Sequence, residues 1–261
     1  MHAMPLDVVP LWLFFILAAL FCVAAVEAGY RLGAGRRARG VDEKEEPVAA
    51  MVASLLGLVA FMLAFTFSLA AARFDARRQA VLEEANAIGT TYLRTRLLPE
   101  PQRTECANLL REYTEVRLNG VADRKITELI SASEKLHEEL WTRAVAAARI
   151  DRSPITALFL QSLNETIDVH SVRLFVGLQS RIPMSNWLAL FCITLLGMVS
   201  IGYQSGLAAA RRSPLMGVLV VAFAGVLLLI VDLDRGQEGF LQVSQQSIID
   251  LLRTMAPAKL E

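Results

Sequence analysis

The sequence holds little of what an enzyme or a disulfide-bonded domain needs. Only three cysteines and three histidines occur in 261 residues, and no two cysteines form a CxxC pair, so neither a disulfide framework nor a metal site is indicated. There is no nucleophile elbow, phosphate-binding loop, HExxH or dinucleotide-binding fingerprint. We therefore expect no catalytic residue and no cofactor. Because 26 basic residues balance 26 acidic residues, nucleic acid is not an expected partner either.

Long stretches of the chain also lack charge. Four apolar runs, at 8–28, 48–72, 187–210 and 214–231, are long enough to cross about 30 Å of hydrocarbon as helices, which takes about 20 residues. The second run contains no ionisable residue at all. Since no lysine or arginine precedes the first run, we expect it to be a retained helix and not a cleaved signal peptide. The chain is thus predicted to be a multi-pass membrane protein surrounded by the lipid bilayer.

The charged segment between the second and third apolar runs has the periodicity of amphipathic helices. We expect helices at 73–98, 102–118, 122–150 and 154–181, the first of which continues the second span. Pro99 should end that helix, Asn119 and Gly120 should end the next, and Ser153 should cap the last. Four such helices can bury their apolar stripes against each other as a bundle.

The predicted fold is therefore all-α, with four transmembrane helices in a two-plus-two arrangement around a helical-bundle domain. We expect a first transmembrane pair with an arginine-rich loop at 1–72, the bundle at 73–185, a second pair at 186–231 and a tail at 232–261. In the tail, Ser244 is expected to cap a short amphipathic helix.

Arginines in the short loops bear on the membrane orientation. Arg36 and Arg37 lie between the first two spans, and Arg211 and Arg212 lie between the last two. Because basic short loops tend to stay in the cytoplasm, both hairpin tips are predicted to face inward, with the bundle and both termini outside. The arginines at 73, 77 and 78, which follow the second span, weaken this bias. The opposite orientation therefore stays open.

Several stretches carry a resemblance to a known family. They are GLVAFMLAFTFS at 57–68, RF at 73–74, RR at 77–78, EANAIGT at 84–90, YLR at 92–94 and LDR at 233–235, followed by Gly239 and Val243-Ser244. In these the chain resembles the bestrophin-like domain family of bacterial membrane proteins over nearly its whole length. The resemblance implies a homo-oligomer in the bacterial inner membrane. Through that family's distant similarity to bestrophin channels, it also implies passage of chloride or another small anion. Bestrophins hold their helical domain in the cytosol, opposite to the orientation predicted above.

The same resemblance singles out one row of side chains on the second span. Bestrophin pores are lined by apolar, largely phenylalanine side chains one helical turn apart, and Gly57, Phe61, Phe65 and Leu69 form such a row here. Side chains four residues apart share a helix face. Copies of this row around an axis would form an apolar constriction that gates by dewetting. The alternative is that both phenylalanines face lipid or pack between helices.

Basic residues at the end of the second span allow two interpretations. Arg73, Arg77 and Arg78 would line a vestibule that concentrates anions, if they face an open mouth. The alternative is a solvated helix face on which these arginines oppose Glu83 and Glu84 at helical spacing.

Polar residues cluster in the third span, where lipid offers them no partners. Ser200, Tyr203 and Gln204 should therefore face other helices or water. Gly202 and Gly206 form a GxxxG pattern, which permits close approach of two helices. Helix packing is thus the favoured interpretation, and pore lining is the second.

Acidic residues are sparse after the last span, where bestrophins carry a dense calcium-binding clasp. Only Asp232, Asp234 and Glu238 occur, interrupted by Arg235, whereas calcium takes six to eight oxygen ligands. We therefore expect no metal. Two functional hypotheses follow: a homo-oligomeric anion channel lined by the second span, and a membrane sensor or scaffold whose helical bundle binds a ligand or a protein.

Overall fold

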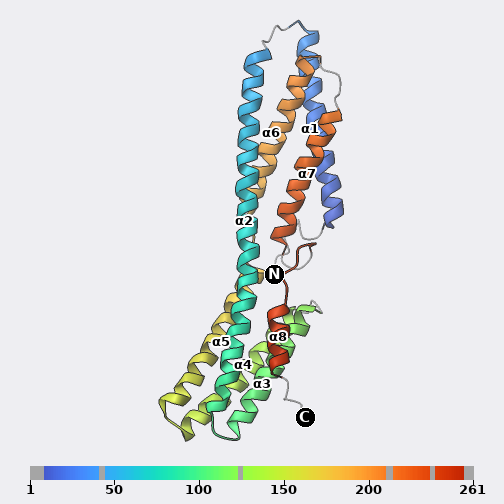
Figure 1. The fold of residues 1–261 in the computed structure, drawn as a ribbon. Coiled ribbons are helices and arrows are strands. Elements are labelled where there is room, and N and C mark those ends of the chain that lie inside the picture. The colour runs from blue at the N-terminus through green and yellow to red at the C-terminus, as the bar shows by residue number, and fades with distance from the viewer. Residues whose placement is uncertain (1–8, 41–44, 123–125, 210–213, 236–238, 256–261) are drawn as a thin grey trace. The chain divides into compact units, whose positions relative to one another are not determined.

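Helices make up most of the part of the chain that the structure describes, with short connections between them. This structure is a computed structural model, and it describes residues 9–40, 45–122, 126–209, 214–235 and 239–255. In chain order the elements are α1 (Leu11–Ala38), α2 (Glu45–Arg94), the short 3-10 helix η1 (Thr95–Leu97), α3 (Gln102–Ala122), α4 (Ile126–Ile150), α5 (Pro154–Leu178), α6 (Met184–Leu207), α7 (Pro214–Asp234) and α8 (Gln246–Thr254), as traced in Figure 1. No strand occurs within these ranges, which confirms the predicted all-α class.

Two compact units make up the chain. The first comprises Met1–Phe74 and Arg181–Gln242, and the second comprises Asp75–Ser180 and Val243–Glu261. Helix α2 contributes to both, because its apolar part continues without a break into its charged part. The predicted continuation of the second span into the bundle is therefore confirmed.

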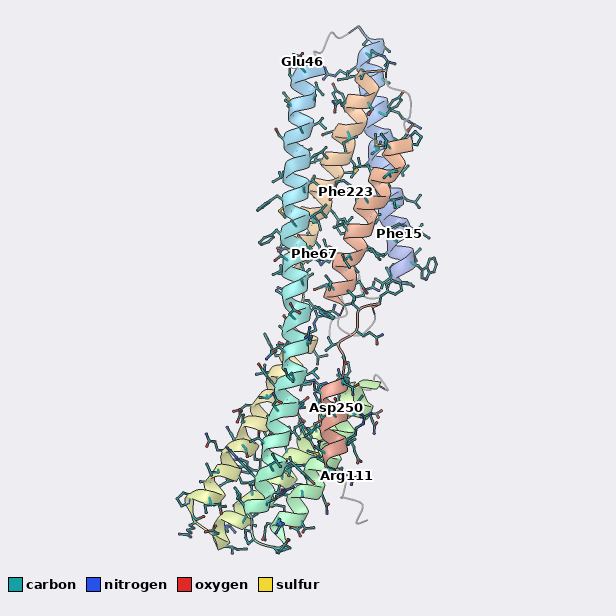
Figure 2. All side chains as sticks on the ribbon, viewed as in Figure 1. Phe15, Glu46, Phe67, Arg111, Phe223 and Asp250 are labelled. Atoms are coloured by element: carbon teal, nitrogen blue, oxygen red, sulfur yellow. The ribbon has the colours of Figure 1, made fainter. Side chains whose placement is uncertain are left out.

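The first unit contains the membrane helices. Four helices are long and apolar enough to cross a membrane, which confirms the two-plus-two arrangement. Their shared core includes Phe14, Val59, Leu190 and Leu227, and Figure 2 labels Phe15, Phe67 and Phe223 on α1, α2 and α7 of this unit. Only 22–28% of each apolar window is buried within the chain. Most of the apolar surface is thus left for lipid or for other subunits.

Glycines allow α1 and α6 to approach each other closely. Gly29 and Gly33 on α1 lie against the backbone of α6, and Gly202 and Gly206 on α6 lie against the backbone of α1. A Cβ atom at any of these four positions would overlap a carbonyl oxygen of the opposite helix. The GxxxG pattern of the third span therefore serves helix packing, as the sequence favoured. Gly29 and Gly33 form a second GxxxG pattern on α1, which packs against the first.

The second unit is the helical bundle. It consists of α2 from Asp75 onward together with η1, α3, α4, α5 and α8. Its apolar core is built from one stripe of each helix and includes Ile88, Leu110, Leu140, Phe159 and Ile248. The 3-10 turn at Thr95–Leu97 ends α2 just before Pro99, as the proline predicts.

Helix boundaries in the bundle test two further predictions. Ser153 caps α5 as predicted, because its Oγ accepts a hydrogen bond from the Thr156 backbone N–H at 3.4 Å. The predicted stop at Asn119 and Gly120 is wrong, because α3 continues to Ala122. A Cβ at Gly120 would lie 2.6 Å from Cδ1 of Leu129. The glycine therefore makes room for a side chain of α4 and does not end the helix.

Candidate functional site

Gly57, Phe61 and Phe65 of the row predicted to line a pore lie on a face of α2 that its own chain leaves exposed, whereas Leu69 packs against the core of the first unit. Phe61 is 64% exposed and Phe65 is 52% exposed, and their rings stack with centroids 6.4 Å apart. Gly57 is exposed with open space where a side chain would stand, and Leu69 is half-buried. Neither phenylalanine packs in the core of the single chain.

The packing face of α2 lies opposite this row. Val59, Leu63, Thr66 and Ala70 are buried in the first unit. They recur at three- and four-residue steps, as one face of a helix does. The aromatic row therefore projects away from the membrane helices of its own chain, toward lipid or toward another subunit.

The three arginines of the predicted vestibule have different surroundings. Arg73 is half-buried, Arg77 is only 5% exposed, and Arg78 is exposed. Glu83 is exposed, and its carboxylate accepts a hydrogen bond from the Gln79 amide at 3.1 Å. The single chain therefore presents Arg78 to solvent and encloses Arg77.

Two serine side chains of the third span donate hydrogen bonds to carbonyl groups of the same helix. Ser200 Oγ donates to the Leu196 carbonyl at 2.8 Å, and Ser205 Oγ donates to the Ile201 carbonyl at 2.9 Å. Tyr203 and Gln204 are half-buried on α6. The neighbouring glycines Gly202 and Gly206 pack against α1, which supports the helix-packing interpretation of this segment.

Carboxylates after the last span bind backbone amides. Asp232 accepts hydrogen bonds from the N–H groups of Phe240 and Leu241 at 2.8 and 3.2 Å. Asp234 accepts from the Ile182 N–H at 3.0 Å. Glu238 lies outside the described residues. No group of three or more His, Cys, Asp or Glu side chains that could hold a metal ion occurs among the residues that the structure describes.

A buried charge cluster lies inside the bundle. Its members are Glu84 on α2, Tyr113 and Arg117 on α3, His137 on α4, and His170 and Arg173 on α5. Glu84 Oε1 accepts a hydrogen bond from the Tyr113 hydroxyl at 3.0 Å and lies 2.8 Å from Arg117 Nε. Glu84 Oε2 accepts from Arg173 Nη1. One fully buried carboxylate is thus shared by two guanidinium groups.

Two histidines complete the buried charge cluster. The ring centroids of His137 and His170 lie 4.8 Å apart, and His170 Nδ1 lies 3.0 Å from the Tyr113 hydroxyl oxygen. Burial, assisted by the positive charge of Arg117, lowers the pKa of each histidine from 6.5 to about 4. Burial also lowers the pKa of Arg173, to about 10. At neutral pH the imidazoles are therefore uncharged and the guanidinium groups remain charged.

The sequence interpretation missed this cluster. One of the two interpretations placed Glu84 on a solvated face; that placement is wrong, because Glu84 is fully buried and lies on the stripe formed by Val81 and Ile88 at helical spacing. The three histidines lie too far apart in the sequence for their spacing to suggest a common metal site. The sequence feature that could have revealed the cluster is a charged or imidazole side chain within the apolar stripe of a helix. His137 is an example, because it lies one residue after Leu136 and three residues before Leu140, both of which belong to the stripe.

Four apolar helices and a helical bundle define the class of this molecule as an all-helical, multi-pass membrane protein. The model of the bestrophin-like domain matches residues 15–248. The chain therefore belongs to the bestrophin-like domain family. No curated protein matches the sequence.

Solved structures share the fold at low sequence identity. A bacterial bestrophin homolog from Klebsiella pneumoniae is 15% identical, with a TM-score of 0.67 over 93% of this chain and 96% of that chain. A mutant of the Klebsiella pneumoniae homolog is 14% identical, with a TM-score of 0.64 over 94% of this chain and 97% of that one. A further crystal structure, described only as a membrane protein, is 15% identical, with a TM-score of 0.67 over 94% and 97% of the two chains. These likenesses concern the fold.

Proposed function

We propose that the protein is not an enzyme but a homo-oligomeric anion channel of the bacterial inner membrane, with α2 lining the pore. The observation that supports this most is the row of Gly57, Phe61, Phe65 and Leu69. Two large aromatic side chains stand on the face of α2 that turns away from the chain's own membrane helices. Membership of the bestrophin-like family and the fold of a bacterial bestrophin homolog support the same proposal.

Several copies of the chain are required for this function. The four membrane helices carry few polar side chains and bury their common face against each other. One chain therefore cannot enclose a path for water and ions, whereas copies around a symmetry axis can. In such an assembly the exposed rings of Phe61 and Phe65 form an apolar constriction that opens and closes by wetting and dewetting.

The direct test combines particle imaging with ion flux. Purified protein in liposomes should form oligomers with an axial pore lined by α2, and it should pass chloride down a gradient. A protein that stays monomeric in liposomes and passes no chloride would refute this proposal.

Replacing Phe61 and Phe65 with alanine separates a gate from a packing surface. If the rings form the constriction, the double variant should assemble normally and conduct more, or without a stimulus, because the surface that expels water is gone. If they pack tightly between helices of neighbouring chains, each truncation should instead weaken assembly by about 3 to 5 kcal/mol. Phe67→Ala is the matched control, because Phe67 lies on the same helix but on another face. Unchanged flux through properly assembled double-variant oligomers would reject the gate.

The bundle supports a second candidate function. Unpartnered nitrogen atoms in the buried charge cluster favour a sensor whose bundle binds a small ligand. Specific stabilisation of the purified full chain by such a ligand, in a protein that passes no ions, would favour the sensor over the channel.

A further inference from the structure

The buried charge cluster carries an unbalanced positive charge. Two guanidinium groups, of Arg117 and Arg173, face one carboxylate, that of Glu84. Both histidines are neutral at pH 7, because the pKa of each is about 4. Arg117 is 2% exposed and Arg173 is 8% exposed, so bulk water does not solvate the surplus charge. A surplus charge at this depth is costly unless a counter-charge accompanies it.

Four buried nitrogen atoms of the cluster have no hydrogen-bond partner, namely Nε and Nη1 of Arg117, Nε2 of His137 and Nε2 of His170. Arg117 Nε still lies 2.8 Å from the Glu84 carboxylate in an ion pair, so Nη1 and the two imidazole nitrogens are the atoms without any partner. These atoms come from α3, α4 and α5, so no single helix explains them. Arg117 also acts electrostatically on both imidazoles, and the two rings are neighbours. Native structures rarely leave buried polar groups unpaired, so a group of unpaired nitrogens calls for an explanation, and a bound water or ion is one.

The Tyr113 hydroxyl determines which ring nitrogen of neutral His170 carries the proton. This hydroxyl has one proton and donates it to Glu84 Oε1. His170 Nδ1, 3.0 Å from the same oxygen, must therefore be the donor of that contact. In the neutral ring this leaves a lone pair on Nε2. An anion beside Nε2 repels the lone pair and favours a proton there, so anion binding and protonation of His170 assist each other.

We propose that the buried charge cluster is a binding site for a small monovalent anion, held by Arg117 Nη1 and His137 Nε2–H and taken up together with a proton on His170 Nε2. The surplus guanidinium charge is the counter-charge of the anion. A metal cation does not fit, because two guanidinium groups repel it. The charged and titratable groups that face His170 are Glu84, Tyr113, Arg117, Glu134, His137 and Arg173.

Bromide provides the direct probe. Crystals of the full chain soaked in sodium bromide at pH 5.5 should show an anomalous peak beside Arg117 Nη1 and His137 Nε2. A difference peak without anomalous signal would identify water and overturn the proposal. Bromide found only at the protein surface would do the same. Because the bundle alone holds this site, liposomes that pass no chloride would reject the channel and leave the bromide result unaffected.

A thermal titration tests the link to the proton. Bromide that replaces gluconate at constant ionic strength should raise the melting temperature of the detergent-solubilised protein, in a saturable way, by on the order of a few degrees. The apparent bromide affinity should be higher at pH 5.5 than at pH 7.5, by up to about tenfold per pH unit. Equal affinity at both pH values would reject proton uptake on His170.

Substitutions locate the effect within the cluster. His137→Phe keeps a ring beside Tyr113 and His170 but removes the nitrogen, and Arg117→Met removes the surplus charge. Both should abolish the bromide peak and the saturable stabilisation. Arg111→Met is the control, because Arg111 is a half-buried arginine on α3 (Figure 2) that pairs with Glu115 and lies outside the buried charge cluster. Since His137→Phe leaves the contacts between Glu84 and the two arginines in place, it tests the site even if Arg117→Met fails to fold. Retained bromide binding in His137→Phe, or its loss in Arg111→Met, would overturn the proposal.

Discussion

Replacing Glu84 with glutamine should lower the local stability of the bundle far more than the same replacement of an exposed glutamate does. The Glu84 carboxylate is fully buried and, among the residues that the structure describes, it is the acidic group paired with the guanidinium groups of both Arg117 and Arg173. Removing one partner of a buried ion pair costs about 3 to 5 kcal/mol, because the remaining charge stays buried without compensation. Here two guanidinium groups lose their shared carboxylate, so the upper part of that range is expected.

Hydrogen exchange measures this cost within the full chain. Amides of α3 and α5 should lose protection by about two to four orders of magnitude in Glu84→Gln, since about 1.4 kcal/mol corresponds to a factor of ten. Glu83→Gln is the matched control, because Glu83 is the preceding residue and is exposed. Its effect should stay within about 0.5 kcal/mol. Similar protection in the two variants would refute the central role of Glu84.

Three further predictions follow from packing, titration and loop charge. Gly202→Leu should separate α1 from α6 and prevent stable insertion or assembly, because its side chain would overlap the α1 backbone; a normally assembled variant would contradict the close contact. In halide-free buffer the bundle should lose stability as the pH falls from about 6.5 to 4, because the unfolded chain then binds more protons than folded His137 and His170. The slope should reach at most about 1.4 kcal/mol per pH unit per histidine, and hydrogen exchange that does not change over this range would contradict it. A reporter fused after Glu261 should behave as extracytoplasmic if the arginine-rich hairpin tips stay inside. A cytoplasmic reporter signal would invert the predicted orientation. Arg211 and Arg212 of the second tip lie outside the described residues.

Membrane spans and the helical class were readable from the sequence because their signals are local. An apolar run of about 20 residues has few alternatives to a membrane helix. Proline beyond the first turn of a helix removes an N–H donor and clashes with the preceding turn, so helices usually end before it, as α2 does before Pro99. The GxxxG pattern of α6 also predicted close packing, although its partner glycines on α1 emerged only from the contacts.

The buried charge cluster was decided by tertiary structure. Glu84, Arg117, His137 and Arg173 are far apart in sequence, and only the packing of α2, α3, α4 and α5 brings their side chains together. The same holds for Gly120, which reads as a helix stop but accommodates Leu129 of α4. The periodic spacing of apolar residues predicts which segments form helices and which face of each helix is apolar. Which charges share a buried space depends on how those stripes meet, because a carboxylate in an apolar stripe is tolerated only where another helix supplies its counter-charge.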